Sequence, residues 1–418
     1  MSKRLFFYLS FYVITLVAGC GSLTNVDNSS EGKDVDNSNT YETLIWSNNE
    51  LGFSLLDKVT PDDNNNIFIS PTSALFAIGM VYNGAEGDTK DEIAKALGLN
   101  EISVDELNQD AASLLDSLDR DMEGVELSIA NSIWLNQEFN LKEEFVNNTR
   151  DFYQAEISQI DVFDDASVDK INNWVSESTK DKIEEIVEAP LHPDLVTLLI
   201  NALYFKGKWK HEFDVDRTEA VPFYTEEKEV EVPMMVLDEK LSYMENPSFQ
   251  AVKLPYGKGE MSMNIFLPRE NSSIDTIIKN FTVDNWNNCQ TEFQAKNGII
   301  KLPKFQVEFE VILNEPLKQL GMENAFDSKK ADFRHIIKEN EQLWVDEVKQ
   351  KTYIDVNEEG TEAAAVTSIA VLRESSIVED TFYMEVNRPF FIAITDDKTG
   401  AILFMGIITN PKTEGGLE

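Results

Sequence analysis

Two stretches in the middle of the chain have the pattern of long β-strands. Apolar residues occupy alternate positions between residues 125 and 136, as in a strand with one buried face. The stretch from 194 to 205 is almost continuously apolar, which is typical of a strand covered on both faces. We therefore expect the second stretch to be a central strand of a large sheet.

Helical spacing surrounds these strands. Apolar residues recur at helical intervals before the polar run 61–66, which ends the predicted helix. The short apolar stretch 67–69 is followed by Ser70 and Pro71, the residue types preferred at a helix N-cap and at the first helical position. Further helices are predicted at 88–98, 142–152 and 167–178.

After residue 205, short apolar stretches alternate with proline and glycine turns, a pattern that predicts twisted antiparallel sheet. The strands expected there cover residues 230–233, 251–256, 261–268, 388–394 and 401–406. Because helices come first and strands later, without a βαβ rhythm, the sequence predicts an α+β fold. No composition boundary divides the chain, so we expect a single domain over residues 41–418.

One stretch has a strand pattern but no obvious sheet. A strand is predicted at 346–357, and the segment 361–371 after it has only uncharged, mostly small residues on one of its two faces. Charged and turn-forming residues follow from Arg373. Two structures fit this pattern: a hairpin with 346–357, and a surface loop rich in small residues.

The chain is strongly acidic. Its 418 residues include 75 acidic and 36 basic side chains, which gives a net charge of -39. Binding to nucleic-acid phosphates or to another polyanion requires clustered Lys and Arg, so neither partner is expected. The apolar content of 42% and the charged fraction of 27% are ordinary for a globular protein, and an acidic surface keeps such a protein soluble.

The N-terminus has the features of an export signal. Two basic residues precede an apolar run at 5–17, and small residues then lead to Cys20. The run is shorter than the roughly 20 residues that a membrane-spanning helix needs. Small residues directly before a cysteine resemble a bacterial lipobox, which implies removal of the signal peptide 1–19, lipidation of Cys20 and attachment of the exported protein to a bacterial membrane, at the cell surface or in the periplasm. Residues 20–40 are polar and predict a flexible tether, and Cys289 is left without a disulfide partner.

The sequence offers little to a catalytic mechanism. Its three histidines, His192, His211 and His335, lie outside any nucleophile or metal-binding motif. The segment 257–259 has too few glycines for a phosphate-binding loop and is expected to be a hairpin turn. We therefore expect neither an enzyme nor a cofactor or metal.

The segment after the 346–357 strand resembles the hinge of the reactive-centre loop of serpins. Further motifs resemble the same family in the same order, at 69–73, 171–175, 201–209, 404–406 and 410–411. The resemblance extends from about Tyr41 to Pro411. The hinge residues that it assigns are Glu358, Gly360, Thr361, Glu362, Ala363, Ala364 and Ala365.

This resemblance implies the serpin fold, an α+β fold with a large mixed or antiparallel main sheet, further sheets, about eight or nine helices and an exposed reactive-centre loop at about residues 358–385. It also implies an inhibitor of proteases, itself no enzyme. The target protease cuts the loop and forms an acyl-enzyme, and it is trapped when the loop inserts into the main sheet as a new strand. Small, uncharged residues on one face of 361–371 suit this insertion, because an unpaired charge that enters the sheet costs several kcal/mol.

The resemblance assigns Ser70, Asn201 and Gln350 to the shutter of the sheet and Trp209 to its breach. Many members of the family carry a histidine where this chain has Gln350. Alternation along 346–357 places Gln350 on the inward face. A buried amide needs hydrogen-bond partners, and the resemblance supplies Ser70 and Asn201.

Two ways of counting locate the reactive bond differently. Counting forward from Glu358 by the spacing usual in inhibitory members places it at Glu374-Ser375, whereas counting back from Pro389 places it near Val378. We prefer the forward count, because the length inserted from the hinge determines where the trapped protease ends.

If the cut lies one residue earlier than the forward count gives, Arg373 becomes the residue before the cut. We therefore expect trypsin-like proteases as the first targets and elastase-like or subtilisin-like proteases as the second, with cysteine proteases as a further class. We expect the inhibitor to be a monomer. The rival hypothesis is a non-inhibitory serpin-like binding or carrier protein at the cell surface, which would have bulky, charged or proline residues on the inner face of its hinge.

Overall fold

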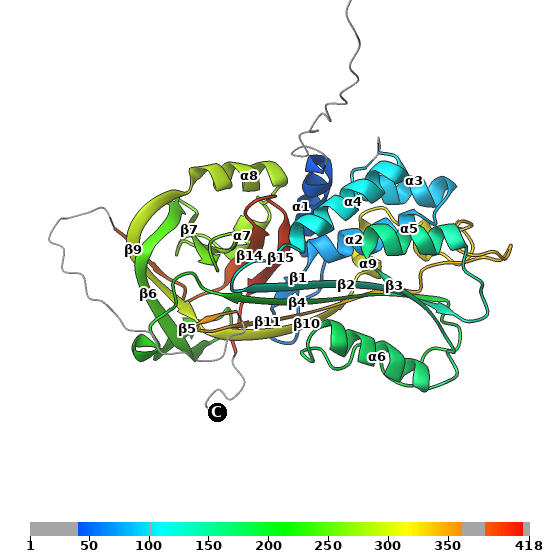
Figure 1. The fold of residues 1–418 in the computed structure, drawn as a ribbon. Coiled ribbons are helices and arrows are strands. Elements are labelled where there is room, and N and C mark those ends of the chain that lie inside the picture. Colours follow the sequence, from blue (N-terminus) through cyan, green and yellow to red (C-terminus); the bar gives the residue numbers. More distant parts are fainter. Residues whose placement is uncertain (1–40, 100–101, 362–380, 413–418) are drawn as a thin grey trace, which may run out of the picture. The chain divides into compact units, whose positions relative to one another are not determined.

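The computed structural model describes residues 41–99, 102–361 and 381–412. They belong to one unit, residues 40–418, in which helices gather around two β-sheets (Figure 1). The helices are α1 (Glu42–Leu56), α2 (Pro71–Tyr82), α3 (Gly87–Ala96), α4 (Val104–Leu118), α5 (Glu143–Tyr153), α6 (Ala166–Ser178), α7 (Ile274–Ile278), α8 (Val283–Glu292) and α9 (Asn314–Gln319). This arrangement confirms the predicted α+β class.

The first sheet has six strands in the described residues. In spatial order they are β10 (Phe305–Ile312), β11 (Glu347–Val356), β12 (Gly360–Thr361), β4 (Thr197–Lys208), β2 (Val125–Asn136) and β3 (Glu156–Ile160). The sheet is mixed, because β11 runs parallel to β4 and β2 runs parallel to β3, whereas the other neighbours are antiparallel.

The second sheet has nine strands in the same described part of the chain. Its order is β1 (Ile67–Ile69), β15 (Ile402–Ile408), β14 (Phe390–Asp396), β8 (Met261–Pro268), β7 (Phe249–Tyr256), β6 (Glu229–Glu245), β9 (Gln294–Pro303) and β13 (Phe382–Glu385), and β5 (Glu219–Tyr224) pairs with β6 beside this path. Strand β1 connects this sheet directly to α2.

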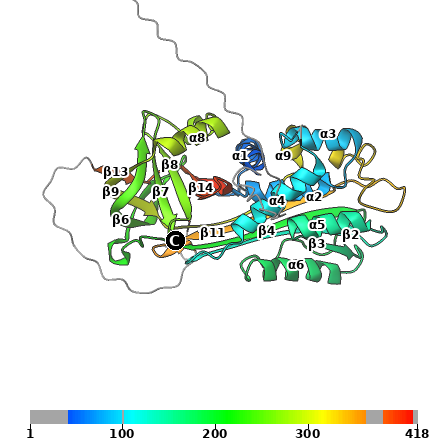
Figure 2. The same ribbon diagram turned by 45° about the horizontal axis from the view of Figure 1, so that its top comes forward.

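Strand β4 is buried on both faces, as its continuous apolar sequence predicts. Leu199 and Leu203 belong to the main core with α1, α2 and the nine-stranded sheet, whereas Leu198 and Ile200 face a second core under α6. Figure 1 and Figure 2 show α6 on one side of the six-stranded sheet and α2, α4 and α5 on the other.

The start of α2 follows from its sequence. Ser70 is the N-cap in an extended conformation, its side chain accepts a hydrogen bond from the backbone N–H of Ser73, and Pro71 occupies the first turn. All residues of α2 are buried. The helix therefore fixes Ser70 in the interior, between the two sheets.

Several predicted strand bounds were wrong. The strand expected at 194–205 begins three residues later and runs to Lys208, because the backbone N–H groups of Leu195 and Val196 donate to the carbonyl oxygen of His192 and to the Asp346 side chain instead of to a neighbouring strand. The strand expected at 230–233 belongs to the 17-residue strand β6, whose polar centre pairs with β9. The hairpin turn at 257–259 is confirmed, with positive φ at both glycines. Among the described residues, no helix has the length and apolarity that crossing a bilayer requires.

Candidate functional site

Strands β11 and β4 are direct neighbours along only part of their length. They pair in parallel from Glu347 beside Leu198 to Thr352 beside Leu203. Beyond this point β12 lies between them. Thr361 pairs antiparallel with Val356 of β11 on one side and with Gly207 of β4 on the other. One end of the sheet is therefore open by the width of a strand, and the first hinge residues fill that gap.

Gly360 is required at this position because the backbones approach closely. A Cβ atom on Gly360 would lie 2.1 Å from the carbonyl oxygen of Gly207 and 2.8 Å from the Cα of Lys208. Both atoms belong to the main chain and cannot turn aside. The short strand β12 can thus enter the gap only with glycine at its first residue.

Trp209 fixes the chain that leads into the hinge. Its backbone N–H donates to the carbonyl oxygen of Glu359, and its indole Nε1 donates to the carbonyl oxygen of Asn357, each at a distance of 2.9 Å. The indole stacks on Tyr256 with a centroid distance of 4.4 Å. The hydroxyls of Tyr256 and Thr361 are hydrogen-bonded at 2.7 Å, so the tryptophan, the tyrosine and the hinge form one connected cluster at the breach.

Glu358 is a buried carboxylate beside this cluster, 7% exposed. It forms an ion pair of 2.8 Å with Lys304 and accepts a hydrogen bond of 2.8 Å from the Thr218 hydroxyl. Burial alone would raise the pKa of Glu358, but the hydrogen bonds from Lys304 and Thr218 outweigh burial and hold that pKa below its ordinary value. The first glutamate of the hinge is therefore charged and anchored at neutral pH.

Gln350 faces inward, as the alternation predicts, and is 1% exposed. Its Oε1 accepts from the backbone N–H of Ser70 at 2.9 Å, and its Nε2 donates to the carbonyl oxygen of Ser70 at 3.0 Å. On the next inward position, the Thr352 hydroxyl donates to the carbonyl oxygen of Phe68. These bonds join β11 to the end of β1 and the start of α2.

Asn201 does not bond to Gln350, although the two residues are register neighbours on β4 and β11. Its Nδ2 donates to Oδ1 of Asn131 on β2 at a distance of 2.9 Å. Asn201 Oδ1 and Asn131 Nδ2 are buried and have no hydrogen-bond partner within the described part of the chain. Of the two partners expected for Gln350, Ser70 is therefore confirmed and Asn201 is wrong.

The other predicted site residues lie outside the described residues. These are Glu362, Ala363, Ala364 and Ala365 of the hinge, Arg373, Glu374 and Ser375 at the reactive bond, and Cys20. Their assignments stay predictions.

Several residues of the site were not found from the sequence. Lys304 and Thr218 bind Glu358, Tyr256 binds Thr361, and Asn131 binds Asn201. Lys304 and Thr218 had no local signal. Asn131 shares a face with the alternating apolar residues of the predicted strand 125–136, which indicated an inward amide but not its partner. Tyr256 ends a predicted strand beside a glycine turn, and that signal indicated only a turn.

Comparison with known proteins agrees with this geometry. The family model described as Serpin (serine protease inhibitor) matches residues 46–411. The chain therefore belongs to the serpin family, whose members are generally protease inhibitors and not enzymes.

Relatives cover nearly the whole domain. A serpin-like protein of Methanosarcina acetivorans is 33% identical over 389 residues, which span 90% of this chain and 89% of that protein. Human serpin B8 is 33% identical over 379 residues, 88% of this chain and all of that protein. The native-state structure of the thermophilic serpin tengpin matches with a TM-score of 0.82 and 31% identity, over 93% of this chain and 96% of that one.

Proposed function

We propose that this protein inhibits proteases by a suicide mechanism, in which the cleaved loop inserts between β11 and β4 and traps the acyl-enzyme. The observation that carries this proposal is the position of β12, which lies antiparallel to both neighbours at the open end of an otherwise closed sheet. A longer β12 would continue along the same path.

The register of β12 sets the length of the inserted strand. Continued along both neighbours, it would bring residue 370 beside Glu347 of β11 and residue 371 beside Thr197 of β4. The preferred reactive bond at Glu374-Ser375 would then follow the end of the paired strand by a few residues. This agreement supports the forward count, which carries the trapped protease to the far end of the sheet.

Insertion also supplies a driving force. The parallel pairing of β11 with β4 would be exchanged for two antiparallel pairings, and antiparallel pairs are slightly more stable per residue. A net gain of about ten backbone hydrogen bonds, at about 0.5 to 1.5 kcal/mol each, amounts to on the order of ten kcal/mol. That is comparable with the stability of a whole domain.

For the targets, Arg373 favours trypsin-like serine proteases, and the neighbouring Leu372 favours elastase-like or subtilisin-like enzymes; cysteine proteases are a further class. Mass spectrometry of the C-terminal peptide released from the complex identifies the bond. A peptide that begins at Glu374 or Ser375 supports the forward count, and one that begins beyond Val378 refutes it.

The proposed location is a bacterial membrane, at the cell surface or in the periplasm, with the monomeric inhibitor attached through a lipid on Cys20. The support is the small-residue run directly before this cysteine.

Thermal unfolding before and after a single loop cut tests the mechanism. If insertion adds on the order of ten kcal/mol, the midpoint should rise by more than about 10 °C, because a domain of this size gains roughly one degree per kcal/mol. An unchanged midpoint after complete cleavage would refute insertion and favour the carrier protein.

A further inference from the structure

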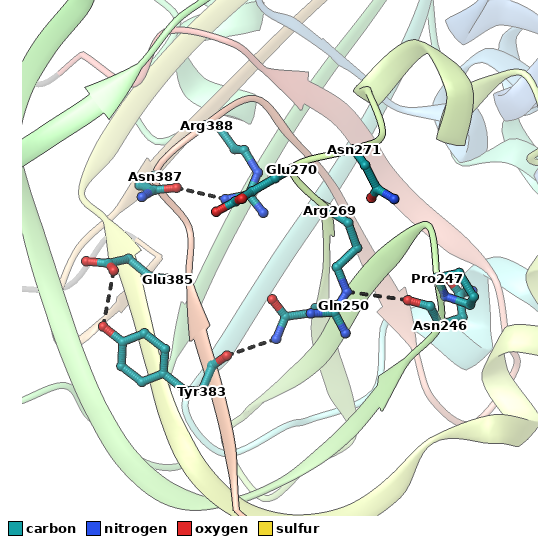
Figure 3. Close-up of a pocket in the computed structure, with 10 residues that line it drawn as sticks. All are labelled: Asn246, Pro247, Gln250, Arg269, Glu270, Asn271, Tyr383, Glu385, Asn387 and Arg388. Atoms are coloured by element: carbon teal, nitrogen blue, oxygen red, sulfur yellow. Dashed lines mark hydrogen bonds between the residues drawn. The ribbon is translucent and has the colours of Figure 1, made fainter.

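A cavity of about 700 Å³, more open to solvent than enclosed, lies in the nine-stranded sheet region, between the β6–β7 turn, the end of β8 and the segment that joins β13 to β14 (Figure 3). Its volume is within the range of small-molecule sites. Almost all of its lining side chains are amides, carboxylates or guanidinium groups. An apolar ligand would therefore find few contacts there, whereas a polar ligand would find many.

Arg388 supplies a half-buried positive charge to this cavity. Its Nε and Nη2 donate to the carbonyl oxygen of Pro268, and its Nη1 donates to Oδ1 of Asn387. These bonds fix the guanidinium and leave two of its five N–H groups for a ligand. No carboxylate of the described residues forms an ion pair with Arg388, and burial lowers its pKa. A partly desolvated cation whose neighbouring carboxylate, Glu270, acts on it through space and not in an ion pair favours an anionic ligand.

The other guanidinium in the cavity is already neutralised, because Arg269 forms an ion pair of 2.5 Å with Glu245. This leaves Arg388 as the group available to an anion. Figure 3 shows Arg269 and Arg388 both directed toward the cavity from different segments.

Gln250 supplies a fixed acceptor. Only 8% of this residue is exposed, and its Nε2 donates to the Tyr243 hydroxyl and to the carbonyl oxygen of Tyr383, at 2.8 and 2.9 Å. Its Oε1 accepts no hydrogen bond from the described residues. Figure 3 shows this amide in the middle of the lining residues, so the free oxygen is held ready for a hydroxyl donor.

We propose that this cavity binds a small hydroxyl-bearing carboxylate of the sugar-acid class. The carboxylate would pair with Arg388, ring hydroxyls would donate to Gln250 and Glu385, and the ring would lie against Tyr383, a residue that is 52% exposed at the rim. The acidic protein disfavours long polyanions, but one half-buried guanidinium suffices for a single carboxylate. This binding is separate from protease inhibition and needs no loop insertion.

Isothermal titration of the full chain with galacturonate at 0.15 M salt tests the proposal. Galactose has the same ring but no carboxylate, so it tests the need for the negative charge. Inorganic phosphate is an anion without a sugar ring, so it tests the need for the ring hydroxyls. Galacturonate should bind saturably with a Kd below about 1 mM, and both comparators should bind at least about tenfold more weakly. No saturable binding, or equal binding of either comparator, would overturn the proposal.

Two variants and a control locate the ligand. Arg388→Gln should weaken galacturonate binding at least about tenfold. Because Arg388 also bonds to Pro268, Tyr383→Ala at the exposed rim is a second variant that keeps these contacts, and it should weaken binding severalfold. Arg334→Gln, which removes an exposed guanidinium outside the cavity, should bind as the natural chain does. Unchanged affinity in either cavity variant, once its folding is verified by circular dichroism, would refute the site.

Discussion

Replacing Gln350 with leucine would remove both hydrogen bonds that join β11 to Ser70 and would keep nearly the same volume. The carbonyl oxygen of Ser70 retains the N–H of Ala74, but the N–H of Ser70 would lose its partner inside the core. Two net hydrogen bonds at about 0.5 to 1.5 kcal/mol each, together with one unsatisfied buried N–H at about 1 to 3 kcal/mol, predict a loss of about 2 to 6 kcal/mol in the free energy of unfolding. At roughly one degree per kcal/mol for a domain of this size, the thermal midpoint should fall by about 2 to 6 °C.

A second substitution at the same position tests the hydrogen-bond geometry. In Gln350→Glu, only the protonated carboxyl can both accept from the N–H of Ser70 and donate to its carbonyl oxygen. Burial raises the pKa of such a glutamate in the folded protein. Its stabilising contribution is therefore full below the unfolded pKa and is lost as pH rises through the folded pKa, so the deficit relative to the natural chain should grow from pH 5 to pH 8.

Unfolding midpoints in urea and on heating, measured at several pH values, provide the assay. Gln306→Glu is the matched control, because Gln306 lies on β10 and bonds to the Tyr353 hydroxyl in a partly buried position. The free energy of unfolding of that variant should depend on pH almost as that of the natural chain does. If Gln350→Leu changed the free energy of unfolding by less than about 0.5 kcal/mol, or if Gln350→Glu showed no pH-dependent deficit, the bonds to Ser70 would not stabilise the closed sheet.

Three further predictions concern the hinge and the anchor. Thr361→Arg should turn the inhibitor into a substrate, because a guanidinium would have to replace the hydroxyl that bonds to Tyr256 inside the sheet; an SDS-stable complex at undiminished stoichiometry would contradict this. Glu358→Gln should lower the free energy of unfolding by about 1 kcal/mol at pH 7 and should reduce its loss on acidification. The pKa of Glu358 is held below its ordinary value by Lys304, and the contribution of this carboxylate is lost as pH falls through that pKa. If the free energy of unfolding of the two proteins changed in parallel with pH, this prediction would be wrong. Cys20→Ala should move the protein from the membrane fraction to the soluble fraction, and unchanged fractionation would exclude lipidation as the anchor.

Local patterns predicted most of the fold that surrounds the site. Alternation located β2 and the inward face of β11 because one face of each strand packs against a core. Ser70 and Pro71 predicted the start of α2, because capping depends on neighbouring residues only. The length of β6 was missed, because its polar centre is stabilised by pairing with β9, which lies far along the sequence.

The contacts of the site depend on tertiary structure in the same way. Lys304 and Glu358 are both ordinary surface residue types until the fold brings them within 2.8 Å. The partner of Asn201 was predicted wrongly for a related reason. Register places Gln350 and Asn201 side by side, but side-chain reach and donor geometry decide which neighbour each amide binds.

The breach and the shutter have opposite effects on the sheet. At the breach, Gly360 and Thr361 already separate β11 from β4, and Trp209 with Glu358 holds the chain that leads into them. At the shutter, the direct β11–β4 pairing and the bonds from Gln350 to Ser70 resist separation. Insertion that starts at β12 would break the β11–β4 bonds one pair at a time, and each incoming residue would replace the lost pairing with bonds to both neighbours. The free-energy cost at any moment would then be that of one or two pairs, so the proposed insertion could proceed quickly once the loop is cut.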